Sequence, residues 1–141
     1  MAEQTITNPA GAFGYSADVL AKGPHTYAEL ITTAAVADRR VVAVSGTGST
    51  GATAGITAQI KAIGIADGAA AVGRSCRVVT YGPVDLVPAD GAIADGAVVK
   101  ASTTTAGSVI TGGVTAAGEV LGFALGAAAG GFVTVFVTKG S

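Results

Sequence analysis

Short apolar runs separated by glycine-rich turns make up most of the chain. From residue 40 onward, runs rich in Val, Ile and Thr recur at intervals of about 10 to 20 residues. This spacing is typical of a β-sandwich or a small β-barrel. We therefore predict an all-β fold with strands at residues 41–44, 60–66, 76–81, 84–87, 97–101, 108–110, 120–125 and 132–138.

The preceding residues, 1–40, are predicted to form an N-terminal arm and one short element. Thr26 followed by Glu29 resembles a capping box that opens a helix over residues 26–37. β-Branched residues such as Ile31 and Val36 also suit a strand there, and we favour the helix. Residues 41–141 are predicted to form a single β domain.

An internal repeat organises this β domain. Residues 40–80 align without a gap on residues 98–138 at an offset of 58, and about 16 of the 41 aligned positions are identical. A repeat has to be recognised before the fold is assigned, because it defines the structural unit. Residues 81–97 are predicted to be a connector of one strand and Asp-Gly turns. We expect two similar halves closed into one domain.

The two copies of the last strand differ in their pattern. In the second copy, Phe132 and Phe136 share one face and Val residues fill the other, so we predict burial on both faces. In the first copy, Arg74 and Arg77 occupy this stretch. We expect these arginines to contact water, a nearby aspartate or another chain, and we expect the second copy to form the core.

Composition narrows the possible partners. The chain has 8 Lys and Arg and 9 Asp and Glu, only 12% charged residues, and a mean hydropathy of +0.60. Without a basic stripe, nucleic-acid binding is not expected. The apolar surface favours a homo-oligomer. The N-terminus does not resemble a secretory signal, and no apolar run of membrane-spanning length occurs, so we expect a soluble protein without membrane contact.

The candidate catalytic and cofactor motifs are weak. Residues 46–51 match the G-x-G-x-x-G pattern of dinucleotide-binding loops, but the second copy reads Thr-Thr-Ala-Gly-Ser-Val at the same positions. We therefore predict a hairpin loop. His25 is the only histidine, Cys76 lies within a predicted strand, and the aspartates between 67 and 95 fit turns. We expect no enzyme activity, cofactor or metal site.

Several of these motifs together resemble a known family. The carrying residues are the stretches 63–66, 82–86 and 90–102, followed by Leu-Gly-Phe-Ala-Leu at 121–125, an alanine run and the final Val/Phe strand. They are similar to the small head decoration, or capsid cement, proteins of tailed bacteriophages. The resemblance covers about residues 58–138, and the first 40 residues depart from the family's short members.

This resemblance implies a role on the virion. It implies a β-barrel-like domain, usually a homotrimer, that binds the major capsid protein on the outer surface of an expanded head after synthesis in the host cytoplasm. A fibre, tail or surface-layer component is the alternative, and a nucleotide-binding enzyme is a distant third. The arm either packs on its own domain or reaches a neighbouring subunit. The predicted contact residues are Phe13, Tyr15, Tyr27, Arg39, Arg40, Arg74 and Arg77.

Overall fold

The computed structural model describes residues 25–45, 49–112 and 116–140. The regular secondary structure in this part of the chain is almost entirely β, as the sequence predicts. A single short 3-10 helix, η1 (Ala117–Glu119), accompanies the strands in this part of the chain. No helix among these residues is long and apolar enough to cross a membrane. The strands are β1 (Thr26–Thr32), β2 (Val41–Val44), β3 (Thr50–Thr53), β4 (Ala62–Ala66), β5 (Ser75–Pro88), β6 (Val98–Ala101), β7 (Val109–Thr111), β8 (Gly122–Ala124) and β9 (Phe132–Val137).

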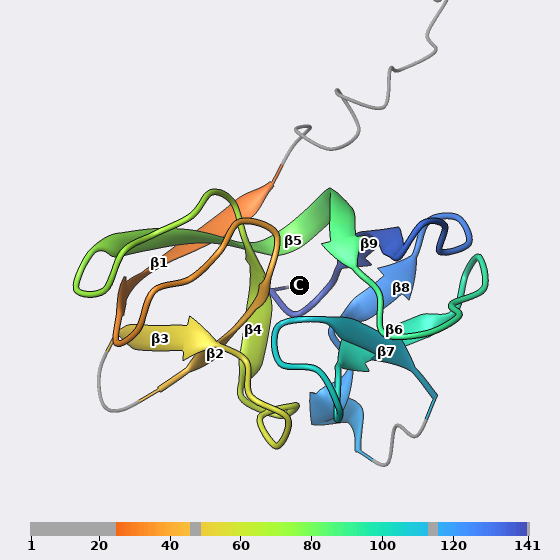
Figure 1. The fold of residues 1–141 in the computed structure, drawn as a ribbon, viewed down its shortest axis with the longest axis horizontal. Coiled ribbons are helices and arrows are strands. Elements are labelled where there is room, and N and C mark those ends of the chain that lie inside the picture. The colour runs from red at the N-terminus through yellow and green to blue at the C-terminus, as the bar shows by residue number, and fades with distance from the viewer. Residues whose placement is uncertain (1–24, 46–48, 113–115, 141) are drawn as a thin grey trace, which may run out of the picture.

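The first half of the chain closes into a five-stranded ring. Its strand order is β1-β3-β2-β4-β5, and β5 pairs back with β1. All pairs are antiparallel except β1 with β3, which is parallel. Closure removes the free edges that an open sheet would expose. This first ring lies on the left of Figure 1.

The second half repeats the same ring. Here the order is β5-β9-β8-β6-β7, with antiparallel pairs throughout. A parallel bridge between Ala89 and Val109 closes the circle, and the Asp90 N–H donates to the Val109 carbonyl at 2.8 Å. The bridge is equivalent to the parallel pair of Thr32 with Gly51 in the first ring.

Strand β5 belongs to both rings. Its first part, from Ser75 to Tyr81, pairs with β1, whereas the part from Gly82 to Pro88 pairs with β9. Figure 1 shows β5 crossing from one ring to the other. The sequence predicted two separate strands here, at residues 76–81 and 84–87. One continuous strand of 14 residues replaces them, and it ties the two rings together.

The repeated unit is therefore larger than the sequence alignment suggested. Strand β1 corresponds to the second part of β5, so the predicted connector is the first strand of the second ring. The helix favoured over residues 26–37 is wrong, because Thr26–Thr32 is a strand. Strand β3, which the sequence did not predict, corresponds to β7. Both β1 and β3 are strands because of the strands with which they pair, rather than because of their own local propensity.

Six interior residues of the first ring have structurally equivalent interior residues in the second ring. In the first ring they form one buried cluster, and in the second ring their equivalents belong to a larger cluster. The larger cluster also contains Val41, Ala43, Ile65 and Val79. The side chains of these four residues project outward from the first ring, toward the second ring. The two rings thus pack against each other. The interior positions are Leu30, Val36, Val42, Ala66, Cys76 and Val78, matched by Val87, Ile93, Val99, Ala124, Val133 and Val135.

The burial predicted for the last strand is wrong. In β9 only Val133, Val135 and Val137 are buried, while Phe132 is 46% exposed and Phe136 is half-buried. The structural equivalent of Phe136 is Val79, because these residues pair with Phe123 and Ile65, respectively. The ungapped alignment, at an offset of 58, instead matches Phe136 with Val78, which is one residue earlier. A shift of one residue moves every side chain of a strand to the opposite face.

Candidate functional site

An exposed apolar surface lies on the outer side of the second ring. Phe123 of β8 stacks on Phe136 of β9, with ring centroids 5.4 Å apart, and Tyr81 meets Phe136 edge-on at 5.2 Å. Val98 pairs with Phe123, and Leu125 and Phe132 lie on the same side of their strands as Phe123 and Phe136, so these three residues share the outer side of the second ring. We call this surface the aromatic face; it comprises Tyr81, Val98, Phe123, Leu125, Phe132 and Phe136.

The aromatic face is exposed although its members are large. Phe132 and Val98 are each 46% exposed, and Phe123 and Leu125 expose more than a third of their surface. None of its six members carries a charge. An apolar patch of this kind on a folded chain marks an interaction surface. The sequence pattern does not reveal this face, because the ungapped alignment places Phe132 and Phe136 in the core.

Arg39 is held by two aspartates. Its guanidinium forms ion pairs with Asp38 at 3.0 Å and Asp85 at 3.1 Å, and its Nε donates to the Asp85 carbonyl at 2.9 Å. Partial burial alone would lower the pKa of Arg39, but the two carboxylates offset this effect and raise it. The side chain therefore connects the loop before β2 to the shared strand β5. Of the predicted contact residues, Arg39 has a clear structural role.

Tyr27 and Arg77 meet on neighbouring strands of the first ring. The Arg77 guanidinium carbon lies 4.9 Å from the centre of the Tyr27 ring, in a cation–π arrangement. Beside them, the His25 Nε2 lies 2.6 Å from the Pro83 carbonyl. Tyr27 is 42% exposed, and Arg77 is also exposed. The structure brings these two predicted contact residues together next to the point where residues 1–24 join the ring.

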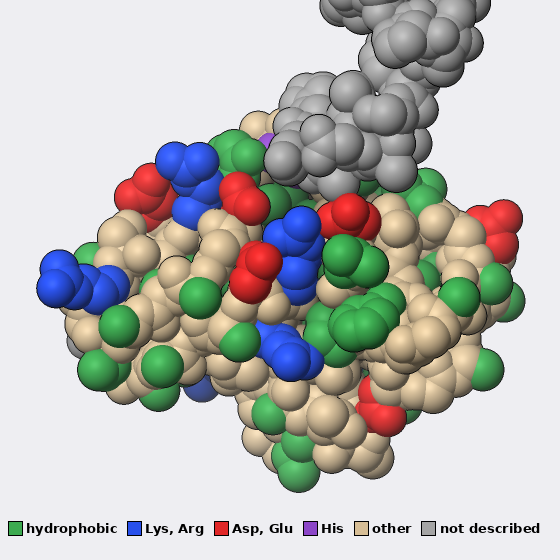
Figure 2. Space-filling view, turned by 45° about the horizontal axis from the view of Figure 1, so that its top comes forward, with side chains coloured by type: hydrophobic (Ala, Val, Ile, Leu, Met, Phe, Trp, Pro, Cys, Tyr) green, Lys and Arg blue, Asp and Glu red, His purple; other side chains and the backbone are tan. Residues whose placement is uncertain are grey.

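The remaining predicted contact residues do not join this pair. Arg74 is exposed in the turn before β5, and Arg40 is half-buried, with its side chain over Gly107 of the second ring. Phe13 and Tyr15 lie outside the described residues. Figure 2 shows how charged side chains of both signs lie close together on one face, with hydrophobic side chains beside them. A surface with both charge signs agrees with the near-neutral composition.

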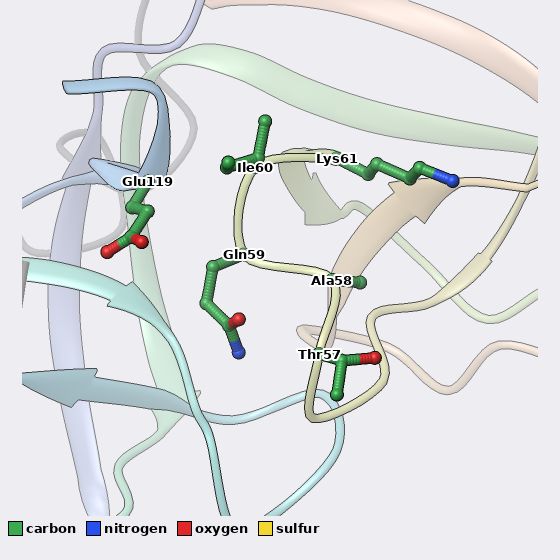
Figure 3. A pocket seen from close by; sticks show the side chains of 6 residues that line it. All are labelled: Thr57, Ala58, Gln59, Ile60, Lys61 and Glu119. Atoms are coloured by element: carbon green, nitrogen blue, oxygen red, sulfur yellow. The ribbon is translucent and has the colours of Figure 1, made fainter. Parts of the chain in front are cut away.

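A cavity of about 420 Å³ lies between the β3–β4 loop and η1. Residues 57–61 and Glu119 line it, and Figure 3 shows that the side chains of Thr57, Ala58 and Lys61 point away from Glu119. Glu119 forms an ion pair with Lys100 at 3.4 Å. The lining therefore places one carboxylate in the cavity, and half of the lining side chains point away from it.

The other chemically distinctive groups have structural roles. Cys76 is buried in the interior of the first ring, and burial raises the pKa of its thiol. Asp90 accepts hydrogen bonds from the hydroxyls of Ser102 and Thr104, which lower the pKa of its carboxyl. Within the described residues, no group of three or more His, Cys, Asp or Glu side chains is arranged to hold a metal ion.

The Gly46–Gly51 motif does not precede a helix. Residues 46–48 lie outside the described residues, but the flanking strands β2 and β3 pair as an antiparallel hairpin. Gly51 itself lies in β3, packed against Leu30. A dinucleotide-binding loop would lead into a helix whose N-terminus faces the pyrophosphate. The hairpin interpretation of this motif agrees with the structure.

Comparisons with known proteins show the fold. No family model matches the chain, and no curated protein matches it by sequence. Among solved structures, the chain is similar to the head fiber gp8.5 N base of bacteriophage phi29, with a TM-score of 0.56 and 17% sequence identity. The similarity covers 82% of this chain and 96% of the fibre base. The two proteins therefore share an architecture over 82% of this chain.

Proposed function

We propose that the protein is a structural component of a bacteriophage particle that binds the outer surface of the head and stabilises the capsid. The observation that carries this proposal is the shared fold with a phage head fibre base, extending over 96% of that base. The resemblance of the sequence to head decoration proteins supports the same location.

Stabilisation would follow from mass action. A protein that binds the assembled lattice but not its separated subunits shifts the equilibrium toward the lattice. The capsid contact in this proposal includes the Tyr27 and Arg77 pair together with Phe13 and Tyr15, the arm residues that the sequence predicts as contacts. Exposed arginine and tyrosine side chains are favoured in such contacts.

Co-sedimentation with empty expanded phage heads tests this role. Purified protein should pellet with expanded heads and should not bind dissociated major capsid subunits with comparable affinity. Decorated heads should also resist thermal disruption better than bare heads. Equal binding to heads and to free subunits, or unchanged resistance of the decorated heads, would contradict the proposal.

A fibre base is the second candidate, because the matched solved structure is itself the base of a head fibre. The two roles predict different distributions on the particle. A decoration protein occupies many positions across the head faces, whereas a fibre base anchors a longer appendage at fewer sites. Electron microscopy of particles labelled with antibody against this protein should show dense coverage of the faces. Label restricted to appendage attachment points would favour the fibre role.

A further inference from the structure

We propose that the aromatic face is the surface through which this chain binds a second copy of itself. The internal repeat gives this face a counterpart in the first ring. In the first ring, Val41 pairs with Ile65, and Ile65 pairs with Val79. In the second ring, Val98 pairs with Phe123, and Phe123 pairs with Phe136. Val98, Phe123 and Phe136 of the second ring are therefore equivalent to Val41, Ile65 and Val79 of the first ring, in that order.

These equivalent positions differ in burial: those of the first ring are covered by the second ring, and those of the second ring are exposed. Val41 and Ile65 are 0% exposed and Val79 is 2% exposed, because the second ring covers them within the same chain. Gly107 of the second ring accepts a hydrogen bond from the Val41 N–H and donates one to the Ala54 carbonyl. The outer side of a ring is thus a packing surface, and the protein itself supplies the partner that covers it.

The second ring has the same outer side without a third ring to cover it. Its residues are larger and more aromatic than those of the first ring, with Phe123 and Phe136 in place of Ile65 and Val79. Buried aromatic residues supply much of the binding energy of protein interfaces. A second copy of the chain offers surfaces of the kind that already cover this side once. The charged residue on this side of β6, Lys100, is buried and forms an ion pair with Glu119 at 3.4 Å, and the six residues of the aromatic face carry no charge that would repel an identical chain.

Self-association through this face does not depend on binding to a phage head. The two properties can therefore be measured separately. Sedimentation velocity of the full-length protein alone reports self-association, and co-sedimentation with expanded heads reports the role proposed above. Failure of one leaves the other standing.

The direct test compares two sets of substitutions. Phe123→Thr combined with Phe132→Thr removes two exposed rings from the aromatic face and keeps residues that suit a strand. Ile31→Thr, at a 47% exposed strand position of the first ring, is the matched control. We expect the wild-type chain and the control to self-associate equally, and the double variant to show a dissociation constant raised by about 30-fold or more.

A chemical cross-link provides a second measurement that does not rely on removing large side chains. The only cysteine, Cys76, is buried, so Val98→Cys places a single accessible thiol on the aromatic face. Under mild oxidation, Val98→Cys should form disulfide-linked dimers about ten times faster than Ile31→Cys, because the interface raises the local concentration of the thiols.

Three results would overturn the proposal. The first is a wild-type chain that stays monomeric at all accessible concentrations. The second is a Phe123→Thr and Phe132→Thr variant that folds and associates like the wild type. The third is a monomeric wild type whose head binding is lost in this double variant, which would assign the aromatic face to the capsid.

Discussion

At the residue scale, Arg39 combines an unfavourable backbone conformation with favourable ion pairs. Its φ of 65° lies in the left-handed region, and the equivalent position in the second ring is Gly96, with a φ of 79°. Both Arg39→Ala and Arg39→Gly remove the ion pairs with Asp38 and Asp85, but only glycine also removes the backbone strain. We expect Arg39→Gly to be more stable than Arg39→Ala by roughly 1 kcal/mol in urea denaturation.

Arg74 is the control for this comparison, because its φ is not positive. At an ordinary φ, glycine adds flexibility to the unfolded chain without relieving strain. Arg74→Gly should therefore be less stable than Arg74→Ala, which is the opposite order. The same order at both positions would show that the left-handed conformation of Arg39 does not strain the folded protein.

Asp90 makes stability depend on pH. Hydrogen bonds from Ser102 and Thr104 lower the pKa of its carboxyl in the folded protein, whereas the unfolded chain has the ordinary aspartate value. Its contribution is complete above the ordinary pKa and is lost as the pH falls through the lower folded pKa. In urea denaturation, the stability difference between wild type and Asp90→Asn should be largest near neutral pH and shrink in acid.

Asp67→Asn provides the matched control, because Asp67 is an exposed aspartate just after β4. This variant should keep the acid-dependent loss of stability that the wild type shows. If Asp90→Asn instead follows the wild-type pH profile throughout the acid range, the hydroxyl contacts do not stabilise the ionised carboxylate.

Contacts between residues far apart in the sequence could not be predicted from the sequence, and the role of the candidate residues as partner contacts stays a prediction. Arg39 and Tyr27 were selected as candidate contacts, and both have defined partners in Asp85 and Arg77. These partners are 46 and 50 positions away, so only the closed ring reveals them. The aromatic face was missed for a related reason. The direction of a strand side chain depends on a register that one inserted or deleted residue reverses.

At the element scale, two glycines allow neighbouring strands to approach closely. A Cβ added to Gly64 would lie 2.0 Å from the Val79 carbonyl oxygen, and one added to Gly122 would lie 2.0 Å from that of Phe136. Because the obstacle is backbone, the strands would have to separate. We expect Gly64→Ala and Gly122→Ala each to destabilise the fold by more than about 2 kcal/mol, measured by thermal denaturation.

Gly55→Ala is the control for these glycine substitutions. No atom lies within 4 Å of a Cβ at Gly55, and its φ is not in the left-handed region. Its stability should stay within about 0.5 kcal/mol of the wild type. A loss at Gly55 as large as at Gly64 would mean that general glycine flexibility, rather than close approach, determines the effect.

The elements that the sequence predicted correctly are those with strong local signals. Val-rich runs such as β2 and the apolar alternation of β9 identify strands by themselves. Strand β3 reads Thr-Gly-Ala-Thr and has little intrinsic preference, so its pairing with β2 and β1 determines it. Strand β1 has helix-capping and β-branched features together, and pairing with β5 resolves that conflict.

At the scale of the whole molecule, duplication explains most of the architecture. The sequence repeat predicted two similar halves but could not show that a single strand belongs to both. That fact depends on β5 pairing with β1 along its first part and with β9 along its second. The C-terminal end also joins the halves, because the Gly140 N–H donates to the Thr80 carbonyl at 2.7 Å. Neither ring is complete without β5.

The shared strand β5, together with the packing of the first ring's outer side against the second ring, predicts that both rings unfold in one transition. Val42 and its equivalent Val99 are almost fully buried, one in each ring interior. Val42→Ala and Val99→Ala should each lower the free energy of unfolding by roughly 2 kcal/mol. Because β5 couples the rings, either substitution should shift the unfolding of both rings equally.

Hydrogen exchange at the backbone amides of β2 and β6 measures this coupling directly. Under conditions where global unfolding limits exchange, Val42→Ala should speed exchange in β6 as much as in β2, and Val99→Ala should do the same in reverse. Exposed Val72, in the loop before β5, gives the control variant Val72→Thr, which should leave both strands at wild-type rates. Faster exchange confined to the substituted ring would show that each ring unfolds independently and that β5 does not transmit stability between them.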